Sequence, residues 1–490
     1  MGDEIADTTF SRENRQRYRD KVKLCLDVFA RMLAEARFDP DRRSIGLEIE
    51  LNLTEETGDP ALANTHVLEL IADDDFQTEL AQFNVEINIP PRTLEGKVFS
   101  ELEATIRRDL NHAEEQSAKA RAHMMVIGIL PTLTEQLLDG SALSANPRYK
   151  LLNEQIFAAR GEDLAISIAG VERLAIMADT IAPEAACTSV QLHQLIDPAR
   201  FGAYWNAAQA IAGLQLAIGA NSPFFFGREL WRETRIALFE QTTDTRPEEL
   251  KTQGVRPRVW FGERWITSIF DLFEENVRYF PALLPVVSDE DPMTVLESGG
   301  APKLQELRLH NGTIYRWNRP IYDIARDRPH LRVENRVLPA GPTIVDTLAN
   351  AAFYYGLVRV LVDDDRPLWS SMSFDAAREN FYEGARSGID ARVYWPNVGE
   401  VPATELVLRR LLPQAREGLA RWDVDAADAD RLLEIIERRC VDQVNGASWQ
   451  AAAFHRLHER RSRADALREM TVRYREHMHS NEPVHTWPLP

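Results

Sequence analysis

The sequence predicts an α+β fold, organised as one large unit with a mostly helical C-terminal part. Four short segments alternate between apolar and polar residues, as strands do when one face packs against a core. Segments with helical spacing of apolar residues lie between them, and helical patterns dominate after Pro342. The sequence contains no internal repeat, low-complexity segment or clear linker. We therefore expect one unit over residues 1–490, with the sheet between residues 44 and 346 and helices over 347–490.

The charge and the cysteines of the chain restrict its possible functions. The net charge is −19, from 57 basic and 76 acidic residues, whereas a sequence-independent nucleic-acid binder needs a basic surface. Cys25, Cys187 and Cys440 lie far apart and form no CxxC pair, which excludes a zinc-finger or redox motif and fits a reducing compartment.

The apolar segments predict a cytoplasmic protein. The N-terminal residues MGDEIADTTF have neither the basic nor the apolar region of a signal peptide. The most apolar long run, Thr343–Val362, contains Asp346, Asn350 and Arg359, and therefore predicts a buried helix rather than a membrane span. We expect no nucleic-acid or membrane partner, and the sequence leaves the oligomeric state open, a homo-oligomer included.

Helices and strands alternate in the first part of the chain. Ser11–Phe38 predicts a long charge-rich helix, and Ser44–Leu53 predicts the first strand. Asn84–Pro90 repeats the strand pattern and ends at a Pro–Pro pair. Phe99–His123 predicts a second amphipathic helix, and Met124–Leu130 a buried strand.

The later segments predict two more strands among helices and loops. Cys187–Ile196 and Leu331–Ala340 have the alternation of strands, and Ala203–Ala220 is an Ala-rich helix suited to close packing. Ser144–Gly161, in which Arg148 and Arg160 stand out, predicts a loop followed by a short helix, and Asn311–Asp323 predicts an aromatic, arginine-rich loop. Further helices are predicted at Ala403–Leu419, Ala426–Val444 and Trp449–His477.

The polar faces of the four strands contain few side chains, most of them chemically active, and no lysine. If the strands are neighbours, their carboxylates form an oxygen-rich site for Mg²⁺ or Mn²⁺, whereas zinc would need more His or Cys. The alternatives are a solvated face for each strand and, for His193, a hydrogen-bonded structural role. The polar residues are Glu48 and Glu50, Glu86 and Asn88, Gln191 and His193, and Arg332, Glu334 and Arg336.

Carboxylates and arginines together indicate an anionic ligand that metal ions bridge to the protein, and a nucleoside triphosphate fits that description. The sequence has no GxxxxGK[ST], GxGxxG or kinase HRD and DFG motif, so a nucleotide would bind through the sheet and its metals. Other arginines have structural alternatives, either a solvated helix face or stacking on Trp317. These are Arg228, Arg232, Arg235, Arg316 and Arg319.

Ordered motifs make the chain resemble the glutamate–cysteine ligase family, in the branch that includes bacterial carboxylate–amine ligases. The motifs follow the family order over about residues 45–346, and NGASWQ at 445–450 also resembles the family. Any one motif is weak, whereas the ordered set is specific. The motifs are GLEIEL (46–51), VEIN (85–88), TSVQLH (188–193), ANSPFFFG (220–227), WRETR (231–235), YRWNRPIYD (315–323) and VENRVLPAGPT (333–343).

The resemblance implies a fold like that of glutamine synthetase and the guanidino kinases, in which a curved, largely antiparallel sheet forms a cup for Mg²⁺ and ATP. It also assigns roles to positions that match the motifs. The implied metal ligands are Glu48, Glu50, Glu86, His193 and Glu334; the ATP contacts are Gln191, Arg332 and Arg336; the substrate contacts are Arg232, Arg235, Arg316 and Trp317; and the catalytic residues are Arg235, Arg316 and Arg336.

The implied reaction joins the γ-carboxyl group of L-glutamate to the amino group of L-cysteine, as in glutathione biosynthesis. The γ-carboxylate attacks ATP to give γ-glutamyl phosphate, and the amine then displaces phosphate. Metals screen the meeting of two anions and arginines stabilise the developing charge, so no protein nucleophile is needed.

One departure from the family and three alternatives accompany this interpretation. Many members have Ser-x-Arg after the NSP segment, whereas Glu233 occupies the serine position here and adds a carboxylate near the expected acyl pocket. The alternatives are the same machinery with another acid or amine, phosphotransfer to a guanidino group, and a non-catalytic nucleotide-binding protein.

Overall fold

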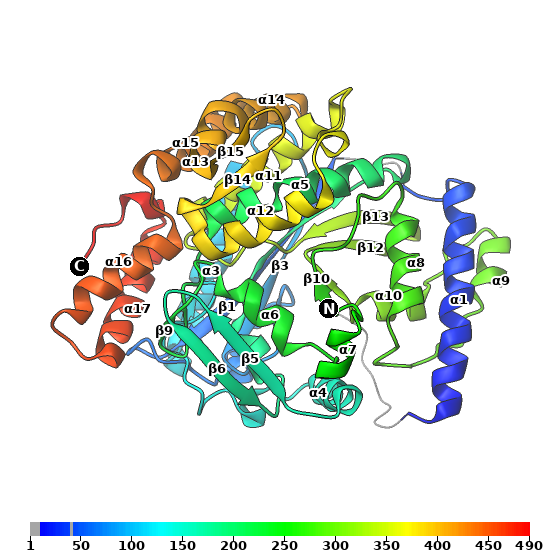
Figure 1. The fold of residues 1–490 in the computed structure, drawn as a ribbon, viewed down its shortest axis with the longest axis horizontal. Helices are drawn as coiled ribbons and strands as arrows, with labels where there is room; N and C mark the ends of the chain where they lie inside the picture. Colours follow the sequence, from blue (N-terminus) through cyan, green and yellow to red (C-terminus); the bar gives the residue numbers. More distant parts are fainter. Residues whose placement is uncertain (1–9, 40–42) are drawn as a thin grey trace.

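A computed structural model describes residues 10–39 and 43–490, and a curled antiparallel sheet lies at its centre (Figure 1). The strand order is β12-β13-β7-β1-β3-β2, and β4 pairs with the end of β1. Every pairing in this sheet is antiparallel. The strands are β1 Ser44–Thr54, β2 Phe76–Thr78, β3 Asn84–Thr93, β4 His123–Met125, β7 Val190–Leu195, β12 Asn318–Ala325 and β13 Arg328–Asn335.

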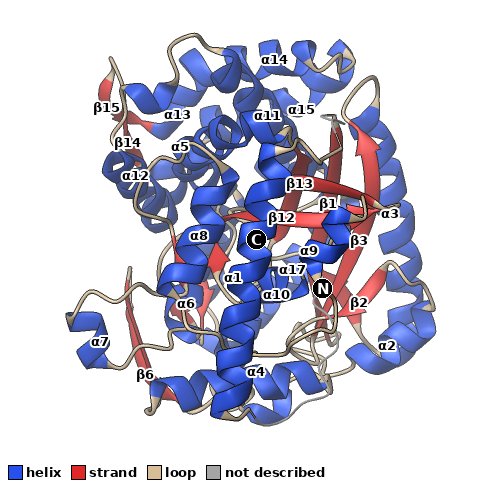
Figure 2. Cartoon of the chain, turned by 90° about the vertical axis from the view of Figure 1, so that its right-hand side faces the viewer, coloured by secondary structure: helices blue, strands red, loops and turns tan. Residues whose placement is uncertain are grey.

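Helices cover the apolar face of the sheet. Residues Ile45 and Leu47 of β1 lie against α3 (Val98–Ser117) and α11 (Ile344–Asp363), and the Tyr355 hydroxyl of α11 donates to the His193 carbonyl at 3.0 Å. Helix α5 (Phe201–Gly219) is buried along almost its whole length, as its predominantly apolar sequence predicts. Figure 2 shows the strands with α11, α14 and α15 stacked beyond one end of the sheet.

The remaining elements surround this centre. Four two-stranded pairs are β5 Leu164–Ala169 with β6 Arg173–Ala178, β8 Phe224–Phe225 with β9 Arg228–Glu229, β10 Val259–Trp260 with β11 Tyr315–Arg316, and β14 Arg392–Trp395 with β15 Gly399–Pro402. The helices are α1 Arg12–Ala34, α2 Asn64–Ile71, α4 Pro147–Arg160, α6 Thr234–Thr242, α7 Glu248–Thr252, α8 Ile269–Tyr279, α9 Pro292–Glu297, α10 Gln305–Asn311, α12 Phe374–Ser387, α13 Ala403–Leu406, α14 Leu412–Arg421, α15 Ala426–Asp442, α16 Gly446–His458 and α17 Arg463–Ser480.

Three expectations about strands are wrong. The strand that begins at Asn84 does not end at Pro90–Pro91 but continues to Thr93, where Thr93 and Arg92 pair with the start of β1. Of the predicted strand at Met124–Leu130, only Met124 and Met125 pair in the sheet, because later carbonyls have other partners. Val126 accepts from the Tyr474 hydroxyl at 2.9 Å, and Gly128 accepts from the Thr188 amide at 3.0 Å. The predicted loop at Asn311–Asp323 instead contains edge strand β12, where Pro320 is tolerated because an edge strand leaves some amide positions unpaired.

The C-terminal helices pack into the same core as the sheet. One continuous cluster of buried apolar side chains extends from Tyr18 to Trp487. Arg475 of α17 donates to the Thr54 hydroxyl at 3.0 Å and to the Glu55 carbonyl at 2.7 Å, so the last long helix holds the end of β1. Among the described helices, none is both long and apolar enough for a membrane span, and the apolar run in α11 is a core helix.

Candidate active site

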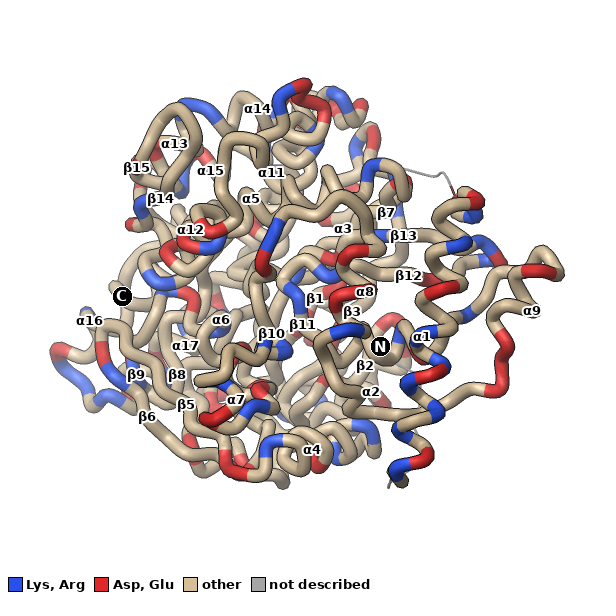
Figure 3. Tube along the Cα trace, turned by 45° about the vertical axis from the view of Figure 1, so that its right-hand side comes forward, with Lys and Arg blue, Asp and Glu red and all other residues tan. Residues whose placement is uncertain are grey.

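Strand register brings the predicted polar residues onto one face. Glu50 lies opposite Glu86 on β3, and Glu48 lies opposite Gln191 on β7. Glu334 of β13 lies opposite His193 of β7. This face lines a cavity of about 340 Å³, and charged positions gather inside the molecule around β1, β3 and β11 (Figure 3). The four separate alternating segments therefore do converge.

Three carboxylates form a tight group at one wall of the cavity. Glu50, Glu79 and Glu86 each place an oxygen within 4.8 Å of the others. Glu50 accepts from the Ser189 amide at 2.5 Å and from the Gln191 side chain at 2.9 Å. Because carboxylate oxygens are the ligands that Mg²⁺ and Mn²⁺ prefer, the donor chemistry of this group fits a hard divalent cation.

The electrostatics of this group favour a bound cation. Burial, together with the nearby Glu48 and Glu50, raises the pKa of Glu86 to about 8. Burial also raises the pKa of Glu50, against the effect of Arg336, and burial and Glu86 raise the pKa of Glu79. Positive charge supplied to the cavity would reverse these shifts, because an opposite charge favours the ionised carboxylate.

The other predicted metal ligands form separate charged pairs beside this group. The His193 Nε2 atom lies 3.0 Å from Glu48 Oε1. Glu334 accepts from Arg319 at 2.7 Å and from Arg336 at 3.0 Å. Burial opposes ionisation of Glu334, but the two arginines and His193 outweigh it and hold its pKa well below the usual range.

Several arginines line the cavity. Two of the predicted ones, Arg332 and Arg235, donate hydrogen bonds to other groups of the protein. Arg332 donates to His193 Nδ1 and to Asp323, both at 3.1 Å. The Arg235 guanidinium lies 5.5 Å from the Trp317 ring centre and donates to the Arg336 carbonyl at 3.4 Å and to the Val337 carbonyl. Arg235, Arg332 and Arg336 all line the cavity.

Arg232, Arg316 and Trp317 do not line the cavity. Arg316 is buried and donates to Glu275 at 2.7 Å, and Arg232 donates to Glu229 at 3.0 Å. Trp317 is buried beneath Arg235. The structure therefore brings Arg235 and Arg336 together with the carboxylates, but leaves these three predicted contacts behind the cavity wall.

The cavity is lined by six charged residues that the sequence did not assign to the site. Three of them, Arg308, Arg319 and Asp323, form ion pairs within the cavity wall, and the other three are Glu79, Glu184 and Arg148. Glu79 lies in the loop after β2, and Glu184 lies in the 3₁₀ helix Ala182–Ala186, so neither belongs to an alternating strand. Arg148 follows the Asn146 cap at the start of α4, and its Nη1 atom is buried with no hydrogen-bond partner in the described residues. The sequence places Arg148 at the predicted start of a short helix, which the Asn-Pro pair before it signals.

The extra carboxylate of Glu233 is directed into the protein rather than into the cavity. It is fully buried and accepts from the Asn221 amide at 2.8 Å, the Ser222 hydroxyl at 2.7 Å and Arg235 Nε at 3.1 Å. Burial raises its pKa, and these donors oppose the rise. Glu233 therefore fixes the turn before α6 and the orientation of Arg235, and it is absent from the residues that line the cavity.

Comparisons with known proteins agree with the ordered motifs. The family model for glutamate-cysteine ligase family 2 (GCS2) matches residues 44–471. A glutamate–cysteine ligase from Francisella tularensis, solved in complex with AMP, has a similar fold, with a TM-score of 0.54 and 13% identity over 93% of this chain and 91% of that chain. A bifunctional glutathione synthetase from Pasteurella multocida matches with a TM-score of 0.48 and 12% identity over 95% of this chain and 55% of that chain.

No curated protein matches the chain in a sequence search. The family model nevertheless covers far more than half of the chain, including all four strands that provide the polar face and most of the C-terminal helices. The chain therefore belongs to glutamate-cysteine ligase family 2 and is an ATP-dependent carboxylate–amine ligase.

Proposed function

We propose that this ligase joins the γ-carboxyl group of L-glutamate to the amino group of L-cysteine through γ-glutamyl phosphate, in the cytoplasm and for glutathione biosynthesis. One observation carries most weight: a single cavity combines a buried oxygen-donor group with a wall of arginines. This is the arrangement that a reaction between a carboxylate and ATP requires, because both reactants are anions. The curled antiparallel sheet supports a fold like that of glutamine synthetase and the guanidino kinases.

We assign divalent cations to the carboxylate wall. Glu50, Glu79 and Glu86 would hold one Mg²⁺, and the neighbouring Glu48, His193 and Glu334 would contribute to a second position. When bound, Mg²⁺ supplies positive charge that offsets the phosphate oxygens of ATP. Gln191 orients Glu50 through its 2.9 Å hydrogen bond, and it lies on the same wall for contact with ATP.

The arginines stabilise and orient the anions that meet in the cavity. Arg336 and Arg319 both contact Glu334, and in this assignment they exchange part of that contact for the transferred phosphoryl group. Arg332 faces the ATP phosphates from β13, and Arg235 and the unpaired Nη1 of Arg148 bind carboxylate groups of the amino-acid substrates. Trp317 positions Arg235 by a cation–π contact, and Arg232 and Arg316 act only through the surrounding protein.

The proposal is tested by measuring phosphate release from Mg·ATP with glutamate fixed and amino acids and amines added one at a time. Products are identified by mass. We expect cysteine to stimulate release and γ-glutamylcysteine to accumulate. Amide formation with a different acid or amine would replace the proposed substrates, and ADP formation without any amide would contradict the acyl-phosphate mechanism.

A further inference from the structure

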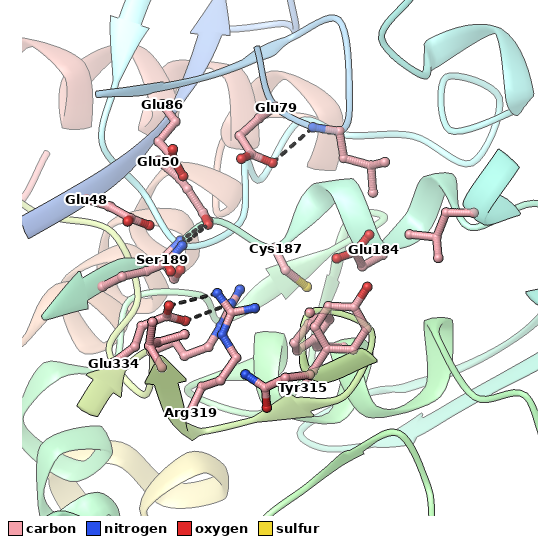
Figure 4. A pocket seen from close by; sticks show the side chains of 18 of the residues that line it. Glu48, Glu50, Glu79, Glu86, Glu184, Cys187, Ser189, Tyr315, Arg319 and Glu334 are labelled. Atoms are coloured by element: carbon pink, nitrogen blue, oxygen red, sulfur yellow. Dashed lines mark hydrogen bonds and ion pairs between the residues drawn. The ribbon is translucent and has the colours of Figure 1, made fainter. Parts of the chain in front are cut away.

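The cavity contains a carboxyl group that neither the cation site nor the arginine wall uses. Glu184 lies on the 3₁₀ helix Ala182–Ala186, among buried alanines, and lines the cavity together with Cys187 and Tyr315. In the described parts of the chain, its side chain forms no hydrogen bond or ion pair. In Figure 4, Glu184 lies across the cavity from Glu48, Glu50 and Glu86. A carboxylate in this position has the freedom to contact a substrate.

The groups around Glu184 leave its negative charge poorly compensated. Burial, and then the charge of Glu50, raise the pKa of Glu184 to about 8, although Arg336 opposes the rise. Other titratable groups lie in the same part of the cavity, but none of them forms an ion pair or hydrogen bond with the Glu184 carboxylate. These are Arg148 and Tyr149 on α4, Cys187 before β7, Arg235 on α6, Tyr315 on β11 and Glu79 after β2.

A cationic ligand group would correct this imbalance. An ammonium group beside Glu184 would form an ion pair in a partly dehydrated pocket, where such a pair is stronger than in water. Phe239 and Tyr315, whose ring centres are 5.2 Å apart, both line the cavity and give this part of it apolar surface. The three carboxylates that would bind metal, Glu50, Glu79 and Glu86, lie on the opposite wall of the cavity. The phosphorylated acid would therefore occupy the space between that wall and Glu184.

We propose that Glu184 binds the ammonium group of the amine acceptor and accepts a proton from it as the amine attacks the acyl phosphate. This inference rests on the proposed ligase function and adds a catalytic residue to it. A protonated amine has no free electron pair, so its ammonium group must lose a proton before or during attack. Among the described carboxylates of the cavity, Glu184 is the one that pairs with no arginine or histidine and lies outside the cation group.

The step balances without another reactant. The nitrogen forms a bond to the acyl carbon, and the bond between that carbon and the phosphate oxygen breaks. Inorganic phosphate leaves with the electron pair. The ammonium nitrogen loses two protons as it becomes the amide nitrogen: one passes to the Glu184 carboxylate and then to solvent, and the departing phosphate takes up the other. The amide, phosphate and the released proton account for all atoms and charges.

The test compares two reactions of the full-length Glu184→Gln variant with Mg·ATP and the acid substrate. In the first, the amine acceptor is present and amide formation is followed from pH 6 to pH 9. In the second, hydroxylamine replaces the amine and traps the acyl phosphate as a hydroxamate. Hydroxylamine is a much weaker base than an aliphatic amine, so in the upper part of this pH range it is uncharged and needs no ammonium site. We expect amide formation to fall about 100-fold or more, as for loss of a general base, while hydroxamate formation stays within about threefold of the wild type.

Three further comparisons make the test specific. Glu184→Asp should restore part of the amide formation and keep the pH-dependent step that Glu184→Gln loses. Glu240→Gln is the matched control, because Glu240 also has a pKa raised by burial, to about 7, but accepts from the Tyr382 hydroxyl at 2.8 Å outside the cavity lining. It should behave as the wild type in both reactions. Thermal unfolding of each variant checks that the fold is kept.

Two results would overturn the proposal. Wild-type amide formation and an unchanged pH profile in Glu184→Gln would show that the carboxylate is not the proton acceptor. Equal loss of amide and hydroxamate formation would place Glu184 in the first step or in the structure instead. If the wild type itself forms no hydroxamate with any acid, the acyl phosphate is absent, and the proposed function fails independently of the variant.

Discussion

Glu50 and Glu334 lie on the same face of the sheet in opposite electrostatic surroundings. Burial raises the pKa of Glu50, and its hydrogen bonds come from an amide and a glutamine. Two arginines and His193 outweigh burial at Glu334 and lower its pKa. Glu50 lacks a positively charged hydrogen-bond partner among the residues that the structure describes and is therefore suited to bind a metal cation. Glu334 is already paired with Arg319 and Arg336, the two arginines that would contact phosphate.

Replacing either carboxylate by its amide should stop the reaction without unfolding the protein. We expect Glu50→Gln and Glu334→Gln each to lower turnover about 100-fold or more, because each loses a charged oxygen at the cation and phosphate sites. Turnover of Mg·ATP with the acid and amine is the measurement. Glu101→Gln, an exposed acid on α3, is the control and should remain active. Near-normal turnover of Glu50→Gln would remove that residue from the cation site.

Glu233 should matter to stability more directly than to chemistry. Its carboxylate is paired with Arg235 and accepts two further hydrogen bonds in a fully buried site. Glu233→Ala removes the only carboxylate that pairs with Arg235 among the described residues and leaves two donors without an acceptor, so we expect the free energy of unfolding to fall by about 3–5 kcal/mol. Urea unfolding followed by circular dichroism measures this change. A loss below about 1 kcal/mol would show that the cluster reorganises around other partners.

Among the secondary-structure elements, the strands with strict alternation were predictable from the sequence and the loops were not. Ser44–Leu53 is realised as β1 because its polar and apolar faces meet different environments. The Met124–Leu130 run is apolar throughout and has no alternation, and nothing in it indicates that Tyr474 and Thr188 donate hydrogen bonds to its carbonyls. Long-range partners of this kind have no local signal.

The same distinction applies to the site. Glu48, Glu50, Glu86 and Glu334 could be identified because their spacing on strands fixes which face they occupy. Glu79, Glu184 and Arg148 reach the cavity from loops and helix ends, where no period relates sequence position to direction. They come to lie beside the strand residues only once the chain is folded around the cavity.

The contact between α11 and α14 depends on two glycines. A Cβ atom on Gly418 would lie 1.7 Å from the Gly356 carbonyl oxygen, so the two backbones leave no room for a side chain. We expect Gly418→Ala to lower the free energy of unfolding by about 1–3 kcal/mol, as for other overpacked sites. Gly140→Ala is the control, because its Cβ would meet nothing within 4 Å. Equal stability of the two variants in urea would contradict the close packing of these helices.

In the molecule as a whole, stability should fall as pH rises from about 5 to 8 when no metal is present. Burial raises the pKa of Glu86 and Glu184 to about 8, whereas a glutamate in an unfolded chain titrates near about 4.3. Between these values the folded protein binds more protons, so the free energy of unfolding decreases with pH, by about 1.4 kcal/mol for each pKa unit of a group.

Divalent cations should counteract this loss, since they bind the ionised carboxylates. Urea unfolding at pH 5.5 and pH 8, in EDTA and in Mg²⁺ with ATP, tests both statements. We expect EDTA-treated protein to be less stable at pH 8 than at pH 5.5, and Mg²⁺ with ATP to stabilise it more at pH 8. A metal-free stability that increases over this range would contradict the raised pKa values.

The position of β1 has a consequence for how the protein is made. This central strand leaves the ribosome well before its partner β7, which begins at Val190, and before α17, the helix that holds its end. Arg475 and Thr54, which form that contact, are 421 residues apart in the chain. Strand β1 must therefore wait for partners that are made much later, among them α11 on its apolar face, so folding in the cell should depend on chaperones.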